Sequence, residues 1–126
     1  MTCTFEPVIG YMATNYGAEK LNINCTQTLT SMFAQIVVQK TVNATFAKQY
    51  NLFWNDTTNQ THTETSNEII YTWSLVPGQV IQDIGFPYFI EAQYNLYGIN
   101  QTTAFDTYSI SLTSICGTTI SANGTF

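Results

Sequence analysis

Residues 32–54 decide the fold class, and they read MFAQIVVQKTVNATFAKQYNLFW. Every even position from Met32 to Trp54 is apolar except Lys40 and Lys48, whereas Gln, Thr and Asn fill most odd positions. Alternation with a period of two is typical of a β-strand that buries one face. The stretch therefore predicts half-buried strands, with the two lysines protecting a sheet edge or marking a bend.

Strand-like runs also dominate the rest of the chain, and they are rich in β-branched and aromatic residues. We place strands near residues 20–30, 31–39, 41–54, 68–76, 86–97 and 104–116, with a shorter one near 117–122. Turn signals separate them at Pro77-Gly78, Gly85, Gly98 and Gly117. This pattern predicts an all-β fold, a single antiparallel β-sandwich of about seven strands, Ig-like or pilin-like. The polar stretch 55–67 is predicted to be a long loop.

Composition excludes several classes of partner. The chain has 126 residues, a suitable length for one domain, and its net charge is -5 with three Lys and no Arg. Nucleic-acid binding needs a basic surface, so we expect no nucleic-acid partner. No apolar run is long enough to cross a bilayer, so we expect no membrane span. With so few ionisable groups, we also expect stability to vary little with pH.

Six N-x-Thr triplets are present, although 11 Asn and 28 Ser plus Thr among 126 residues would give only about two by chance. Their asparagines are Asn24, Asn43, Asn55, Asn59, Asn100 and Asn123. Three of them fall on the polar parity of alternating runs. This density predicts a heavily N-glycosylated protein that is extracellular or on the cell surface, with its leader removed. We expect no cofactor besides the covalent N-linked glycans.

Three cysteines leave two pairings open in an exported chain. A Cys25–Cys116 disulfide would join two distant strand-like runs and staple the sandwich. The alternative, Cys3–Cys25, would close a short N-terminal loop. Either pairing leaves one cysteine for an intermolecular bond or a free thiol. Three scattered cysteines do not form a tetrahedral metal set, so we expect no metal site.

The sequence provides no convincing catalytic constellation. His62 is the only histidine and lies in the polar 55–67 stretch, where Glu64 and Glu68 do not complete a known ligand spacing. A two-carboxylate glycosidase would have to use Glu91, Asp83 or Asp106, and Glu91 has the outward parity of its run. We therefore expect no enzymatic activity. Trp54 and Trp73 share parity with core positions, and core packing is the simpler role for both.

The first 16 residues are predicted to form an N-terminal arm, and residues 17–126 the β-sandwich domain. The arm has apolar residues whose spacing fits neither a regular strand nor a helix. One interpretation is an ordinary first strand; the other is an extended arm that completes the sheet of a neighbouring subunit. In the second case the subunit contacts are Phe5, Val8, Ile9, Tyr11 and Met12.

Thr-, Asn- and Gln-rich, Arg-poor β-sandwich subunits with many N-glycosylation sites resemble the subunits of archaeal surface threads. The resemblance covers the composition and layout of the whole chain. It implies a filament in which subunits are linked by donor-strand complementation, similar to bacterial chaperone-usher pilins. Residues 2–16 would then contain the donor strand.

Three functional hypotheses follow. The first is a structural subunit of an extracellular filament that polymerises head to tail with copies of itself by β-strand addition. The second is a surface adhesin, an S-layer-associated domain or a glycan-binding domain, with surface or host contacts. The third is a virion coat, tail or spike protein.

Overall fold

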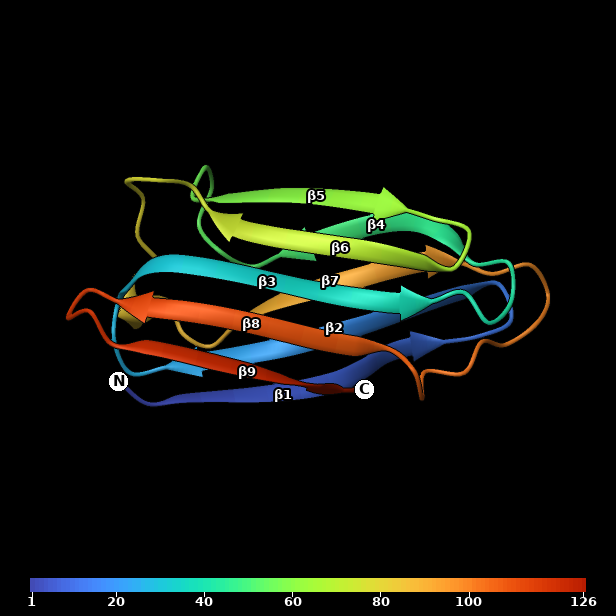
Figure 1. Ribbon diagram of the computed structural model, residues 1–126, viewed down its shortest axis with the longest axis horizontal. Coiled ribbons are helices and arrows are strands. Elements are labelled where there is room, and N and C mark those ends of the chain that lie inside the picture. The colour runs from blue at the N-terminus through green and yellow to red at the C-terminus, as the bar shows by residue number, and fades with distance from the viewer.

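The computed structural model describes residues 1–126 as two antiparallel sheets packed face to face (Figure 1). Sheet A has the strand order β1-β2-β7-β4, and sheet B has the order β5-β6-β3-β8-β9. The strands are β1 (Cys3–Met12), β2 (Tyr16–Cys25), β3 (Leu29–Gln39), β4 (Thr45–Asn51), β5 (Thr58–Glu64), β6 (Glu68–Leu75), β7 (Tyr88–Asn95), β8 (Thr107–Ser114) and β9 (Thr119–Thr125). One short 3-10 helix, η1 (Asp83–Gly85), precedes β7. The all-β sandwich predicted from the sequence is confirmed.

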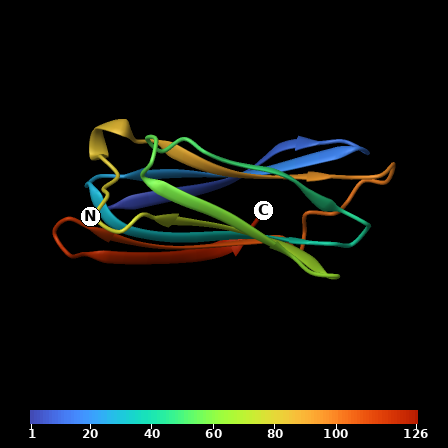
Figure 2. The same cartoon turned by 90° about the horizontal axis from the view of Figure 1, so that it is seen from above.

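The alternation of the sequence places the core between the two layers (Figure 2). In β3, the even positions from Met32 to Val38 are buried, and the residues between them face outward. β6 and β7 alternate in the same way, so Tyr71, Trp73 and Tyr94 lie between the sheets. Aromatic and branched side chains of this size supply most of the apolar area that stabilises the fold.

A β-bulge in β4 explains the lysine that interrupts the apolar parity. Phe46 is paired with Tyr94 and Lys48 with Gln93, so Ala47 is an extra residue in the strand. The extra residue reverses the alternation, and Lys48 and Tyr50 face solvent. Of the two roles predicted for this lysine, protecting an edge or marking a bend, the structure shows the bend. The same reversal corrects the core placement of Trp54, which is 52% exposed.

The prediction that residues 55–67 form a loop is wrong, because β5 occupies most of that stretch. Threonine-rich segments are good strand formers, and β5 pairs with β6 along its length. Gln60 accepts a hydrogen bond from the indole N–H of Trp73 at 3.0 Å, and the His62 ring stacks on Phe46 with centroids 3.5 Å apart. These inward contacts hold a strand whose sequence has no apolar residue. With β1 also paired, the sandwich has nine strands instead of about seven.

Residues 3–12 form an ordinary edge strand of the same sandwich. β1 pairs with β2 of its own chain from Cys3–Cys25 to Met12–Gly17. Of the two interpretations of the N-terminal segment, an ordinary first strand or an extended arm, the structure has the first strand. Exchange of this strand between subunits stays a prediction. Separately, the structure contains no helix long and apolar enough to cross a membrane.

Candidate functional site

All six sequon asparagines are exposed on the surface. Asn24 lies on the outer face of sheet A, near the end of β2. Asn59 and Asn123 lie on the outer face of sheet B, in its two edge strands β5 and β9. Asn43, Asn55 and Asn100 lie in loops. Of the five asparagines outside sequons, Asn15 and Asn67 are exposed and the other three are half-buried. The fold therefore leaves every predicted site open to glycosylation.

We expect native protein to carry glycans at these six asparagines and at no other. Mass spectrometry of peptides from the native protein would measure the occupancy of each site. Thr61→Val, which removes the Asn59 sequon at an exposed position of β5, should delete one glycan and leave the fold unchanged. Native protein whose six asparagines are all unmodified would contradict the expectation.

The disulfide joins Cys3 to Cys25, so the preferred Cys25–Cys116 pairing is wrong and the alternative holds. The two cysteines face each other across β1 and β2, in a pair of residues that do not hydrogen-bond to each other. Their Cα atoms are 4.1 Å apart, the close spacing of such pairs. Cys116 lies beyond the end of β8 in the turn to β9, exposed and unpaired. The spacing of the cysteines along the chain does not reveal that Cys3 lies opposite Cys25. That register depends on the regular pairing of β1 with β2 from Cys3 to Ile9, before the bulge.

The residues predicted as subunit contacts do not form one surface. Phe5 and Met12 pack against the core of their own chain, and Val8 is half-buried on the outer face of sheet A. Ile9 and Tyr11 are exposed. Only part of this set is thus free to contact another molecule in this arrangement.

The two long sides of the sandwich differ. Between β4 and β5, the Gln49 amide donates to the carbonyls of Thr61 and Thr72 at 2.9 and 3.0 Å, and the Asn51 amide donates to Gln60 at 2.8 Å. The backbone N–H of Phe46 also donates to Glu64. These bonds close that side. On the opposite side, β1 and β9 lie next to each other (Figure 1), and no hydrogen bond joins them.

β9 is a free sheet edge without a protecting residue. The backbone N–H of Ser114 donates to Thr118, and that of Phe126 donates to Asp106, so the even-numbered residues of β9 are the ones that hydrogen-bond to β8. The backbone N–H and C=O groups of the odd-numbered residues 119–125 therefore point away from the sheet. β9 contains no charged residue and no proline. β1 differs, because Pro7 occupies a position where the backbone nitrogen faces the free edge. Natural edge strands usually carry such blocking residues.

A buried pair of carboxyl groups connects the two sheets. Glu19 of β2 and Asp106, which directly precedes β8, are fully buried, and neither Glu19 Oε2 nor Asp106 Oδ2 has another hydrogen-bond partner, so a proton shared between the two carboxyl groups joins them. Burial, and then the hydrogen bond and charge of Asp106, raise the pKa of Glu19 to about 10. Tyr94 donates to Glu19 at 3.3 Å, and the Gln39 N–H donates to Asp106 at 2.8 Å. Glu19 therefore keeps its proton at neutral pH and donates it to Asp106.

Sequence reasoning did not identify Glu19 as a buried residue. It shares the parity of Leu21, Ile23 and Cys25, so extending their alternation by one step would have placed it in the core. Its partner could not be found in this way, because Asp106 follows an irregular loop. Asp106 was considered only as a candidate acid in a turn.

The other candidate catalytic residues are not brought together. Glu91 lies on the outer face of sheet A, and Asp83 begins η1, where it accepts a hydrogen bond from Thr28 at 3.1 Å. His62 and Glu64 lie in β5, and Glu64 forms an ion pair with Lys40 at 3.9 Å. No group of three His, Cys, Asp or Glu side chains is placed to hold a metal ion.

The fold and its sites define an antiparallel β-sandwich with a disulfide-linked edge strand. No family model and no curated protein matches the chain. Among solved structures, the chain is similar to the cohesin module from Clostridium perfringens ATCC13124 family 33 glycoside hydrolase. The TM-score is 0.53 at 9% identity, and the match covers 97% of this chain and 91% of that module. At this identity the likeness shows the sandwich fold alone.

Proposed function

We propose that this chain is a structural subunit of an extracellular, N-glycosylated filament that grows head to tail by β-strand addition. The observation that carries the proposal is the unprotected edge of β9 beside β1, opposite a side that hydrogen bonds close. A free edge offers a row of backbone donors and acceptors to another strand.

The positions of the sequons support this direction of assembly. Glycans on Asn59 and Asn123 would project from the outer face of sheet B at its two edge strands. Sugar chains there prevent the face of one sheet from stacking on another. They leave the backbone edge of β9 accessible, because side chains in a strand project perpendicular to the hydrogen-bonding direction.

Exchange of β1 is a second route of strand addition, which uses the edge of β2 instead of that of β9. β1 is the terminal strand of its sheet, none of its side chains is fully buried, and residues 13–15 alone connect it to β2. At about 3.3 Å per residue, its ten residues span about 33 Å. A neighbour's β1 that occupied the same position would place its Cys3 against Cys25 of the accepting subunit. Exchange would therefore convert the disulfide into a covalent link between subunits.

The experiment combines electron microscopy with non-reducing gel electrophoresis of native, glycosylated protein carrying Cys116→Ser. This substitution removes the exposed thiol, so any covalent link between subunits must use Cys3 and Cys25. We expect thin fibres that run as a ladder without reductant and as a single subunit with reductant. Fibres of unlinked subunits would contradict exchange of β1 and leave polymerisation by edge addition. Monomers at high concentration would contradict the filament itself.

A glycan-binding surface domain is the second candidate. It is favoured by exposed tyrosines on the outer face of sheet A, where Asn24 is the only sequon. A folded monomer that forms no fibres but binds sugars would support it.

A further inference from the structure

Two β-bulges turn tyrosines onto the outer face of sheet A. In β1, Ile9 pairs with Glu19 and Tyr11 with Ala18, so Gly10 is an extra residue. In β4, Ala47 is the extra residue. Without these insertions Tyr11 and Tyr50 would share the parity of core residues. Bulges in edge strands often redirect a side chain toward a functional site.

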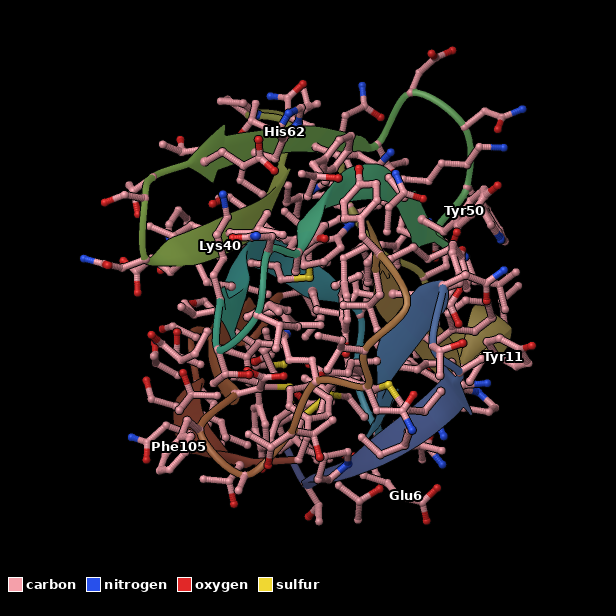
Figure 3. All side chains as sticks on the ribbon, turned by 90° about the vertical axis from the view of Figure 1, so that its right-hand side faces the viewer. Glu6, Tyr11, Lys40, Tyr50, His62 and Phe105 are labelled. Carbon is pink, nitrogen blue, oxygen red and sulfur yellow. A yellow bond between two sulfur atoms is a disulfide. The ribbon has the colours of Figure 1, made fainter.

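The redirected tyrosines lie on the two edge strands of sheet A, in cross-strand rows two residues apart. Tyr11 is 54% exposed and its ring contacts Tyr16, with centroids 5.9 Å apart, while Tyr50 is 44% exposed and pairs with Glu91. Figure 3 shows Tyr11 and Tyr50 on the same side of the sandwich. Gln93 and Glu91 of β7 lie between these edge strands, and each is paired with a lysine on the same face, Gln93 with Lys48 and Glu91 with Lys20.

The polar groups between the tyrosines are held in place by hydrogen bonds. The Tyr16 hydroxyl donates to the Gln93 carbonyl oxygen, and the Gln93 amide donates to Glu91 Oε2 at 2.8 Å. Glu91 Oε1 and the hydroxyls of Tyr11 and Tyr50 have no hydrogen-bond partner within the protein. A Cβ at position 10 would lie 3.2 Å from Glu91 Oε1, so glycine at the bulge leaves room beside this oxygen.

We propose that this face, between Tyr11 and Tyr50, binds a neutral hexopyranose unit of a glycan. A sugar ring presents one apolar face and several hydroxyls, which match an exposed aromatic ring beside a fixed carboxylate. Glu91 accepts hydrogen bonds from sugar hydroxyls, and the two free tyrosine hydroxyls donate to or accept from others. This inference does not depend on polymerisation, because β9 takes no part in it and a neighbour's β1 in the same position would present the same Tyr11.

The ligand could come from the N-linked glycan of a neighbouring molecule or from a polysaccharide in the surroundings. Both present the same hexopyranose chemistry to the site. The experiment therefore uses simple methyl glycosides to establish binding, and glycans released from the protein itself to distinguish the two sources.

Saturation-transfer difference NMR on the full native chain provides the test, with methyl α-D-mannopyranoside and methyl α-D-glucopyranoside as probes. We expect transfer to the ring protons of at least one probe, with a millimolar Kd. Tyr50→Ala and Glu91→Gln should each weaken binding about tenfold, as expected for the loss of one ring or one charged hydrogen bond. Released glycans that bind more tightly than the methyl glycosides would identify a neighbouring molecule as the source; glycans that bind no better would favour an external polysaccharide.

Phe33→Ala is the matched control, because Phe33 is 49% exposed on the outer face of sheet B. It should leave binding unchanged. Tyr50→Phe keeps the ring and the packing, so it tests the hydroxyl even where Tyr50→Ala lowers stability. Absence of transfer to any probe in the wild-type chain would overturn the proposal, as would equal losses in Phe33→Ala and Tyr50→Ala.

Discussion

The free energy of unfolding should rise as the pH falls from 8 to 5. Burial raises the pKa of Glu19 to about 10, far above its ordinary value of 4.5. Above pH 4.5 the unfolded chain releases this proton and the folded chain keeps it, so stability decreases with pH up to the folded pKa. The slope is at most about 1.4 kcal/mol per pH unit for one group. The pKa of Asp106 is raised as well, chiefly by burial, and its contribution has the same sign.

Urea unfolding at pH 5, 6.5 and 8, with the disulfide intact, measures this dependence. Glu19→Gln retains an amide donor for Asp106 and an acceptor for Tyr94 but cannot ionise, so its stability should be nearly constant over this range. At pH 8 the variant should exceed the wild type by a few kcal/mol. Glu6→Gln, on the exposed face of β1, is the control and should keep the wild-type slope. A wild-type chain that loses stability on acidification would refute the role of the pair.

Loss of the Cys3–Cys25 disulfide should have the second large effect. In the chain-entropy model, a cross-link between residues 22 positions apart contributes about 3 kcal/mol. The double variant Cys3→Ala/Cys25→Ala should therefore unfold at a clearly lower urea concentration. β1 should be affected most, because its side chains are at best half-buried and one neighbour alone holds it.

Hydrogen exchange measured by NMR or mass spectrometry locates the change. Amides of β1 should exchange much faster in the double variant, whereas those of β3, in the middle of sheet B, should change only with global stability. Cys116→Ser serves as the control, because that thiol is exposed and unpaired. Equal protection of β1 in the variant and the wild type would show that strand pairing alone holds the N-terminal segment.

The acid stabilisation expected from this pair differs from the flat pH profile that the small number of ionisable groups predicts. Counting charges treats each group as solvated, whereas one carboxyl in the core outweighs all the exposed ones.

Parts of the candidate sites were predictable because they depend on local patterns. Glu91 was placed facing outward from its parity alone, and the six sequons were placed outside the core, where the structure has them. The strand at β5 was missed because its inward residues are polar: Gln60 accepts a hydrogen bond from Trp73 of the neighbouring strand, and His62 stacks on Phe46 of the opposite sheet. The orientations of Tyr11 and Tyr50 were equally hidden, since an inserted residue changes the face without changing composition.

By itself, the sequence determined an antiparallel sandwich with a charge-poor, sequon-rich surface, because alternation and composition act within a few residues. Only the tertiary structure decided that Cys25 pairs with Cys3, that Glu19 meets Asp106, and that β9 has a free edge. Each of these depends on strand order and register. Register is set by how all the apolar faces fit together, and a single bulge reverses it for every residue that follows.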